Sequence, residues 1–103
     1  MENNFDFSWT YKDFAIRTKH QNFTNDPVDK NRPLELVKYN DREHTTCFTL
    51  AWFVLTKEGY ELQFVGDRPF EYISPNDISE IWVQLMIAQK VLDLFYSLEI
   101  SKD

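Results

Sequence analysis

Apolar and polar residues alternate along several stretches of the first 73 residues, which is the spacing of β-strands. The clearest are residues 34–39 and the longer stretch 45–56, which is rich in Thr, Phe, Trp and Val. Both alternate sets of side chains in 45–56 are largely apolar. The pattern therefore predicts a central strand that is covered on both faces of the sheet.

A β-hairpin is expected next, because a turn around Gly59 precedes residues 60–65, which alternate cleanly. The side chains expected to face the core are Tyr60, Leu62 and Phe64, and those expected on the other side are Glu61 and Gln63.

The rest of the N-terminal part gives weaker signals. Residues 68–73 are expected to add only a short or edge strand, because Pro69 has no N–H for a sheet hydrogen bond. Residues 5–9 and 13–18 are further strand candidates. The polar stretch 19–33 is expected to be a surface loop.

A long helix is predicted from Ser74 onward. Ser74 is a suitable N-cap, and Pro75 is tolerated at the first helical position. Asp77, three residues after the cap, favours both a capping box and the positive end of the helix dipole. Nothing interrupts the helical pattern before about Leu98, so roughly 24 residues give a length of about 36 Å.

Two apolar faces are expected on this helix. The first, wide enough to pack on a sheet, contains Ile78, Ile81, Trp82, Leu85, Ala88, Leu92, Phe95 and Tyr96. The second lies across the helix and contains Val83, Ile87, Val91, Leu94 and Leu98. One sheet cannot cover both faces. Either the N-terminal aromatic residues fold over the second face, or that face is an interface with a partner. The aromatic residues concerned are Phe5, Phe7, Trp9 and Phe14.

These elements predict a single α+β domain over residues 1–103. It has an antiparallel sheet of four to six strands, with one long C-terminal helix packed on one face. The strands are expected to be antiparallel, because no helix pattern lies between them to serve as a parallel crossover. The residues expected in the core include Trp52, Phe64, Trp82, Leu85 and Phe95.

The chain of 103 residues has 17 acids against 11 Lys and Arg, so its formal net charge is −6. Residues 1–33 are neutral, whereas 34–73 and 74–103 each carry a net charge of −3. Nucleic acid is not an expected partner, because binding to phosphates requires clustered basic residues. The acidity either serves solubility or forms a surface that competes with nucleic acid for a basic groove on another protein.

Cys47 is the only cysteine, so no intramolecular disulfide is expected and a reducing, cytoplasmic location is favoured. The first residues lack the pattern of a signal peptide. The longest apolar run, residues 47–55, is about half the length that a transmembrane helix needs, so no membrane association is expected.

Candidate chemistry is sparse. His44 and Cys47 are three residues apart, and His20 is distant, so a metal site lacks ligands. Catalysis by Cys47 with His44 as base is disfavoured, because Cys47 is expected to be a buried thiol in an apolar strand. No cofactor is predicted, because two glycines cannot form the usual phosphate-binding loops.

Acidic residues gather around the predicted hairpin and its exit. They are Glu58, Glu61, Asp67 and Glu71, and they form a second candidate surface for a partner. Asp67 beside Arg68 is a separate group, which can lock a turn through hydrogen bonds to the backbone.

Four stretches resemble small uncharacterised proteins encoded by phages and prophages of Gram-positive bacteria. They are 47–52 (CFTLAW), 58–62 (EGYEL), 64–70 (FVGDRPF) and 89–93 (QKVLD), within residues 34–95. The resemblance implies an accessory protein made in the cytoplasm of the bacterial host. Such short acidic proteins often bind and block a host enzyme or defence complex, as anti-CRISPR proteins do.

Three classes of function remain open from the sequence. The first is an interaction protein that inhibits or modulates a host macromolecule, with no enzymatic activity of its own. The second is a homo-oligomeric structural or assembly protein, for which a homodimer is the simplest form. The third is an enzyme or a small-ligand binder, which would require convergent polar groups in a cleft.

Overall fold

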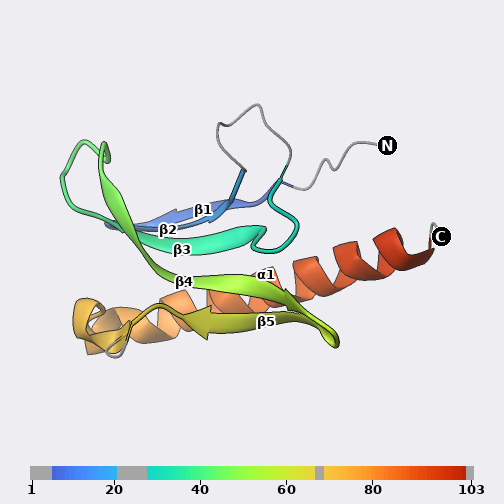
Figure 1. Ribbon diagram of the computed structural model, residues 1–103. Helices are drawn as coiled ribbons and strands as arrows, with labels where there is room; N and C mark the ends of the chain where they lie inside the picture. Colours follow the sequence, from blue (N-terminus) through green and yellow to red (C-terminus); the bar gives the residue numbers. More distant parts are fainter. Residues whose placement is uncertain (1–5, 21–27, 67–68, 102–103) are drawn as a thin grey trace.

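The structure is a computed structural model that describes residues 6–20, 28–66 and 69–101. It contains one five-stranded antiparallel sheet in the order β1-β2-β3-β4-β5, with the helix α1 packed against one face (Figure 1). The strands are β1 (Ser8–Tyr11), β2 (Phe14–Thr18), β3 (Leu34–Tyr39), β4 (Cys47–Thr56) and β5 (Gly59–Phe64). A 3-10 helix η1 (Pro69–Tyr72) leads into α1 (Pro75–Ser101). The predicted α+β class is therefore confirmed, and each strand pairs with its neighbour in sequence.

The expectation that 45–56 is covered on both faces is wrong, because α1 lies on one face only. The register between β3 and β4 shifts after Leu36, so that Leu50 is an extra residue on β4. A β-bulge of this kind moves the following side chains to the other face. Phe48 and Leu50 therefore pack into the core from one half of β4, and Ala51 and Phe53 from the other. This change of phase explains why neither alternate set of the strand is polar.

The hydrophobic core lies between the sheet and α1. The helix contributes Ile81, Leu85, Ala88 and Leu92, all buried. Ile78, Val91 and Phe95 pack at its margin, together with Phe7, Trp9, Tyr60, Leu62 and Phe64. The hairpin prediction is thus confirmed, because Tyr60, Leu62 and Phe64 join the core while Glu61 and Gln63 are exposed.

Trp82 and Trp52 correct the predicted core. Trp82 is 43% exposed, because it lies about 90° around the helix from the buried residues. Trp52 pairs with Glu35 and Gln63 on the face of the sheet opposite α1, where it is half-buried. The guanidinium of Arg32 lies 4.2 Å from the centre of its indole ring.

The predicted edge strand at 68–73 is also wrong, because Pro69–Tyr72 form the turn of 3-10 helix η1. Pro69 has no N–H to donate to β5, and its fixed φ suits a helical turn. The sheet of the described residues therefore ends at β5.

The N-terminus of α1 is fastened to the turn between β1 and β2. Ser74 caps the helix, because its side-chain oxygen accepts a hydrogen bond from the N–H of Asn76 at 3.2 Å. The buried Asp77 carboxylate accepts hydrogen bonds from Lys12 Nζ at 2.7 Å and from the Tyr11 hydroxyl at 3.1 Å. Asp77, which was expected to favour a capping box and the helix dipole, therefore also holds α1 against the sheet.

This contact predicts a dependence of stability on pH. The hydrogen bond from Lys12 lowers the pKa of Asp77 below its ordinary value of 3.8. Such a carboxylate stabilises the fold above the ordinary pKa, and the contribution is lost as the pH falls through the lower, folded-state pKa. Urea unfolding between pH 7 and pH 2 should show this loss in the wild type and a smaller one in Asp77→Asn. Lys12→Met should reproduce the behaviour of Asp77→Asn, and an unchanged acid profile in both would contradict the role of the contact.

Candidate functional site

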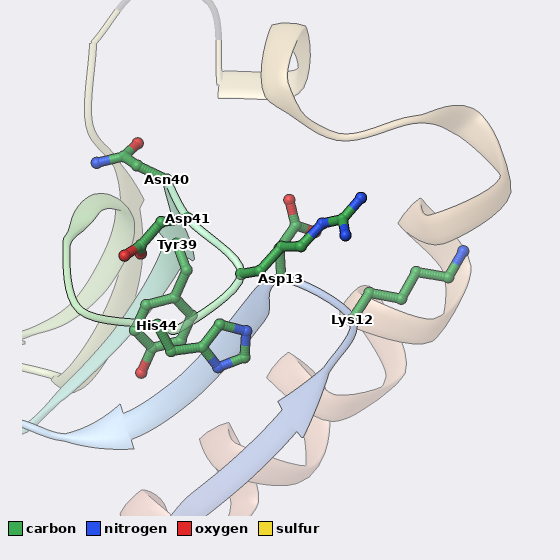
Figure 2. Close-up of a pocket in the computed structure, with 7 residues that line it drawn as sticks. Lys12, Asp13, Tyr39, Asn40, Asp41 and His44 are labelled. Atoms are coloured by element: carbon green, nitrogen blue, oxygen red, sulfur yellow. The ribbon is translucent and has the colours of Figure 1, made fainter.

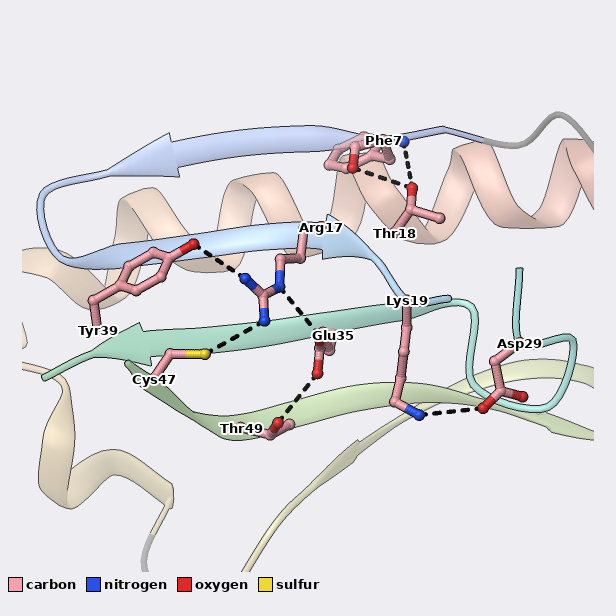
Figure 3. A network of polar contacts seen from close by, with 9 residues as sticks. All are labelled: Phe7, Arg17, Thr18, Lys19, Asp29, Glu35, Tyr39, Cys47 and Thr49. Carbon is pink, nitrogen blue, oxygen red and sulfur yellow. Dashed lines mark hydrogen bonds and ion pairs between the residues drawn. The ribbon is translucent and has the colours of Figure 1, made fainter. Parts of the chain in front are cut away.

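A polar network occupies the face of the sheet opposite α1 (Figure 3). Arg17 on β2 stands directly opposite Glu35 on β3 and donates from Nε to its Oε2 at 3.1 Å. Arg17 also donates to the Tyr39 hydroxyl at 3.2 Å and to Cys47 Sγ at 3.3 Å. Thr49 Oγ1 donates to the other carboxylate oxygen of Glu35 at 3.1 Å. These groups satisfy one another, so the network stabilises the sheet and offers few polar atoms to a ligand.

Cys47 and His44 have different neighbours. Cys47 is half-buried beside Arg17, which corrects the expectation of a buried thiol. The His44 ring instead stacks on Tyr39, with 4.2 Å between the ring centroids and 7° between the planes. Within the described residues, no three His, Cys, Asp or Glu side chains are grouped so that they could hold a metal ion.

A shallow pocket of about 370 Å³ lies between the β1–β2 turn and the loop 40–46 (Figure 2). Figure 2 shows the Tyr39 and His44 rings lying together on one side, with Lys12 extending away from them. Lys12 is paired with Asp77, and Asp13 is paired with Lys38.

The acid of the same loop is also engaged by the fold. The Asp41 carboxylate accepts hydrogen bonds from the Thr45 side chain and from the N–H groups of Thr45 and Thr46. The Thr45 hydroxyl is the main cause that lowers the pKa of Asp41 below its ordinary value. Three charged groups of the pocket, those of Lys12, Asp13 and Asp41, are therefore already engaged within the fold.

The predicted acidic surface is dispersed. Glu58 lies in the β4–β5 turn and Glu71 in η1, beyond the other end of β5. A strand of six residues separates them by roughly 20 Å. Glu61 is exposed between them and alternates to the side opposite α1. Asp67 lies outside the described residues, as does the predicted pairing of Asp67 with Arg68.

The second apolar face of α1 is exposed over most of its length. Val83 and Ile87 are exposed, and Leu94 is 64% exposed. Val91 is partly buried and packs against the core, while the side chain of Leu98 lies outside the description. Phe7, Trp9 and Phe14 pack in the core on the inner side of α1, so they do not cover this face. Phe5 lies outside the described residues.

Two exposed residues enlarge this face beyond the predicted set. Trp82 and Met86 are also exposed on α1. Around the helix axis they lie next to Val83, and Val91 lies on the other side of Val83. We call the five exposed residues the outer stripe: Trp82, Val83, Met86, Ile87 and Leu94. The helical projection could have identified Met86, and it places Trp82 at the very margin of the predicted core-facing arc.

Comparisons of the chain with protein-family models, with curated proteins and with solved structures find no match. None of the helices that the structure describes has an apolar stretch long enough to cross a membrane. The resemblance to phage-encoded proteins stays a prediction.

Proposed function

We propose that this protein is a small interaction protein that binds another protein through the outer stripe of α1. The observation that carries the proposal is the concentration of exposed apolar side chains on one helix. Seven large hydrophobic residues are exposed among those described, and five of them form the outer stripe. Such a concentration of exposed apolar side chains on one helix is typical of a binding site.

The shape of the stripe supports a protein partner. From Trp82 to Leu94 it extends for about 18 Å along a helix whose other face is fixed in the core. A preformed helix loses little conformational entropy on binding and can enter an apolar groove through side chains at i, i+4 and i+11. Val83, Ile87 and Leu94 have this spacing.

The proposed context is that of the phage resemblance. The partner is then a host protein or protein complex, such as a defence or nucleic-acid enzyme, whose activity this protein inhibits or modulates in the bacterial cytoplasm. Direct binding to nucleic acid is disfavoured by the net charge of −6. The proposal requires no catalytic residue and no cofactor.

Two substitutions that introduce charges into the outer stripe test whether it is the binding surface. Ile87→Glu with Leu94→Lys should abolish capture of a specific partner from a bacterial lysate, because both side chains are exposed and the new charges would have to be desolvated. The matched control places the same charges on exposed strand positions, as Ser8→Glu with Thr10→Lys. Circular dichroism and the thermal midpoint should match the wild type for both.

Salt dependence separates the two predicted surfaces. Binding through the outer stripe should change little between low and physiological salt, because apolar contacts are weakly screened. Binding through the predicted acidic surface should weaken strongly, since exposed charges are screened over about 8–10 Å. That surface comprises Glu58, Glu61, Asp67 and Glu71. If the stripe variant stays folded and still captures the partner, the contact lies away from α1 and the proposal is wrong.

A further inference from the structure

At the outer edge of the sheet, every second residue of β5 directs its backbone N–H and C=O groups away from β4. The N–H of Val65 donates to the carbonyl of Leu50 at 2.8 Å, so Val65 is directed toward β4. Backbone groups along a strand alternate in direction, so those of Leu62 point away from β4. The contact of the Tyr60 carbonyl with Gln89 Nε2 on α1, at 2.9 Å, agrees with this alternation. In Figure 1, β5 forms the edge of the sheet farthest from β1.

We propose that β5 pairs in antiparallel fashion with β5 of a second copy of this chain, in a register centred on Leu62. The two sheets then form one continuous sheet of ten strands about a twofold axis. Leu62 faces Leu62 of the second copy, and both residues direct their backbone groups outward, as a hydrogen-bonded pair requires. Any register displaced by one residue would oppose an outward residue with an inward one.

The side chains of β5 are self-complementary in this register. On the α1 side, Tyr60 stands opposite Phe64 of the second copy, an aromatic pair that is favourable across strands. On the other side, Glu61 stands opposite Gln63 of the second copy, which places an acceptor against an amide donor. The strand Gly59–Phe64 also lacks Pro and Lys, the residues that commonly prevent pairing at an exposed edge.

The helix α1 approaches the outer edge of β5. Gln89 approaches the Tyr60 carbonyl from the helix, and a carbonyl oxygen can accept a second hydrogen bond. Trp82 lies within about 20° of Gln89 around the helix, on the flank next to the β5 edge. The second copy would add surface beside this exposed indole. The helices lie on the same side of the joined sheet, so Val83, Ile87 and Leu94 still face outward.

Charge substitutions at the two exposed positions test the register. Gln63→Glu places two carboxylates directly opposite Glu61 in the dimer, and should raise the dissociation constant about 2- to 30-fold in sedimentation equilibrium. Gln63→Lys should lower it by a similar factor. The double variant Glu61→Lys with Gln63→Glu should restore association, because opposite charges then face each other. The matched control is Glu58→Lys in the β4–β5 turn, outside the paired residues. It should not show the changes in dissociation constant expected for the substitutions at position 63.

A backbone change tests the hydrogen bonds themselves. Native ligation at Cys47 allows the chain to be assembled with an N-methyl group on Leu62, which removes one outward N–H and no hydrogen bond to β4. This protein should keep its thermal midpoint under monomeric conditions and lose most of its self-association.

Outcomes that overturn the proposal differ from those that overturn the function. A wild-type chain that remains monomeric at about 1 mM has no such dimer. If substitutions at Glu61 and Gln63 leave self-association unchanged but Ile87→Glu abolishes it, the contact between copies is formed by the outer stripe. That result also overturns the proposed β5 pairing. Neither result bears on capture of a partner protein by that stripe. Adding salt should strengthen the proposed dimer, because it screens the repulsion between Glu61 side chains about 7–8 Å apart and between two acidic chains.

Discussion

Replacing Phe53 by alanine is expected to lower the free energy of unfolding by about 3–5 kcal/mol. Phe53 is 1% exposed in the centre of β4, where it stands between Leu34 on β3 and Leu62 on β5. Removal of its ring loses buried apolar area and leaves a cavity that neighbouring strands cannot fill without distorting the sheet. A loss of this size is a large share of the stability of a domain of this length.

The measurement is urea unfolding followed by circular dichroism, with Trp82→Ala as the matched control. Both changes remove a large aromatic side chain, but Trp82 is 43% exposed and lies beside the core. The control should therefore cost well under half of the loss seen for Phe53. Equal losses in the two variants would mean that Trp82 is buried in solution, either by its own chain or by a second copy.

Arg17→Met is expected to cost about 2 kcal/mol, the second-largest effect. The substitution leaves the Glu35 carboxylate, which is 8% exposed, without its cation, and it removes the donor to the Tyr39 hydroxyl. A buried carboxylate that loses its partner retains the cost of desolvation. Because the Arg17 side chain is 40% exposed, water can approach the site, and the loss is smaller than for a fully buried pair.

A double-mutant cycle with Glu35→Gln isolates the interaction. If the ion pair is responsible, Arg17→Met should lower the free energy of unfolding much less in the Glu35→Gln background. A neutral amide has no charge that is left without a partner when Arg17 is removed. Arg17→Lys should recover only part of the loss, since a single ammonium cannot contact Glu35, Tyr39 and Cys47 together. A full cost in both backgrounds would assign the effect to lost packing of the Arg17 stem on the sheet.

The sequence alone determined the elements that depend on local interactions. Residues 34–39 form a strand with the predicted bounds, because its β-propensity and alternation agree with its place in the sheet. The start of α1 follows from Ser74 and Pro75, which set the cap within a few residues. The hairpin faces of Tyr60, Leu62 and Phe64 follow from strict alternation around a glycine turn. The α+β class followed from the order of these elements.

Only the tertiary structure decided how the elements meet. The bulge at Leu50 exchanges the two faces of β4. Its position along β4 depends on the pairing with β3, where Leu36 stands opposite Ala51 and Val37 stands opposite Thr49. Trp82 is left outside the core because the four residues directly above the sheet already fill the space beneath α1. The outer stripe is exposed because the nearby aromatic residues lie on the inner side of α1: β1 pairing holds Trp9 there, and hydrogen bonds with Thr18 hold Phe7. Hydrophobicity determines which side chains favour burial, whereas the limited area of one sheet face determines which of them obtain it.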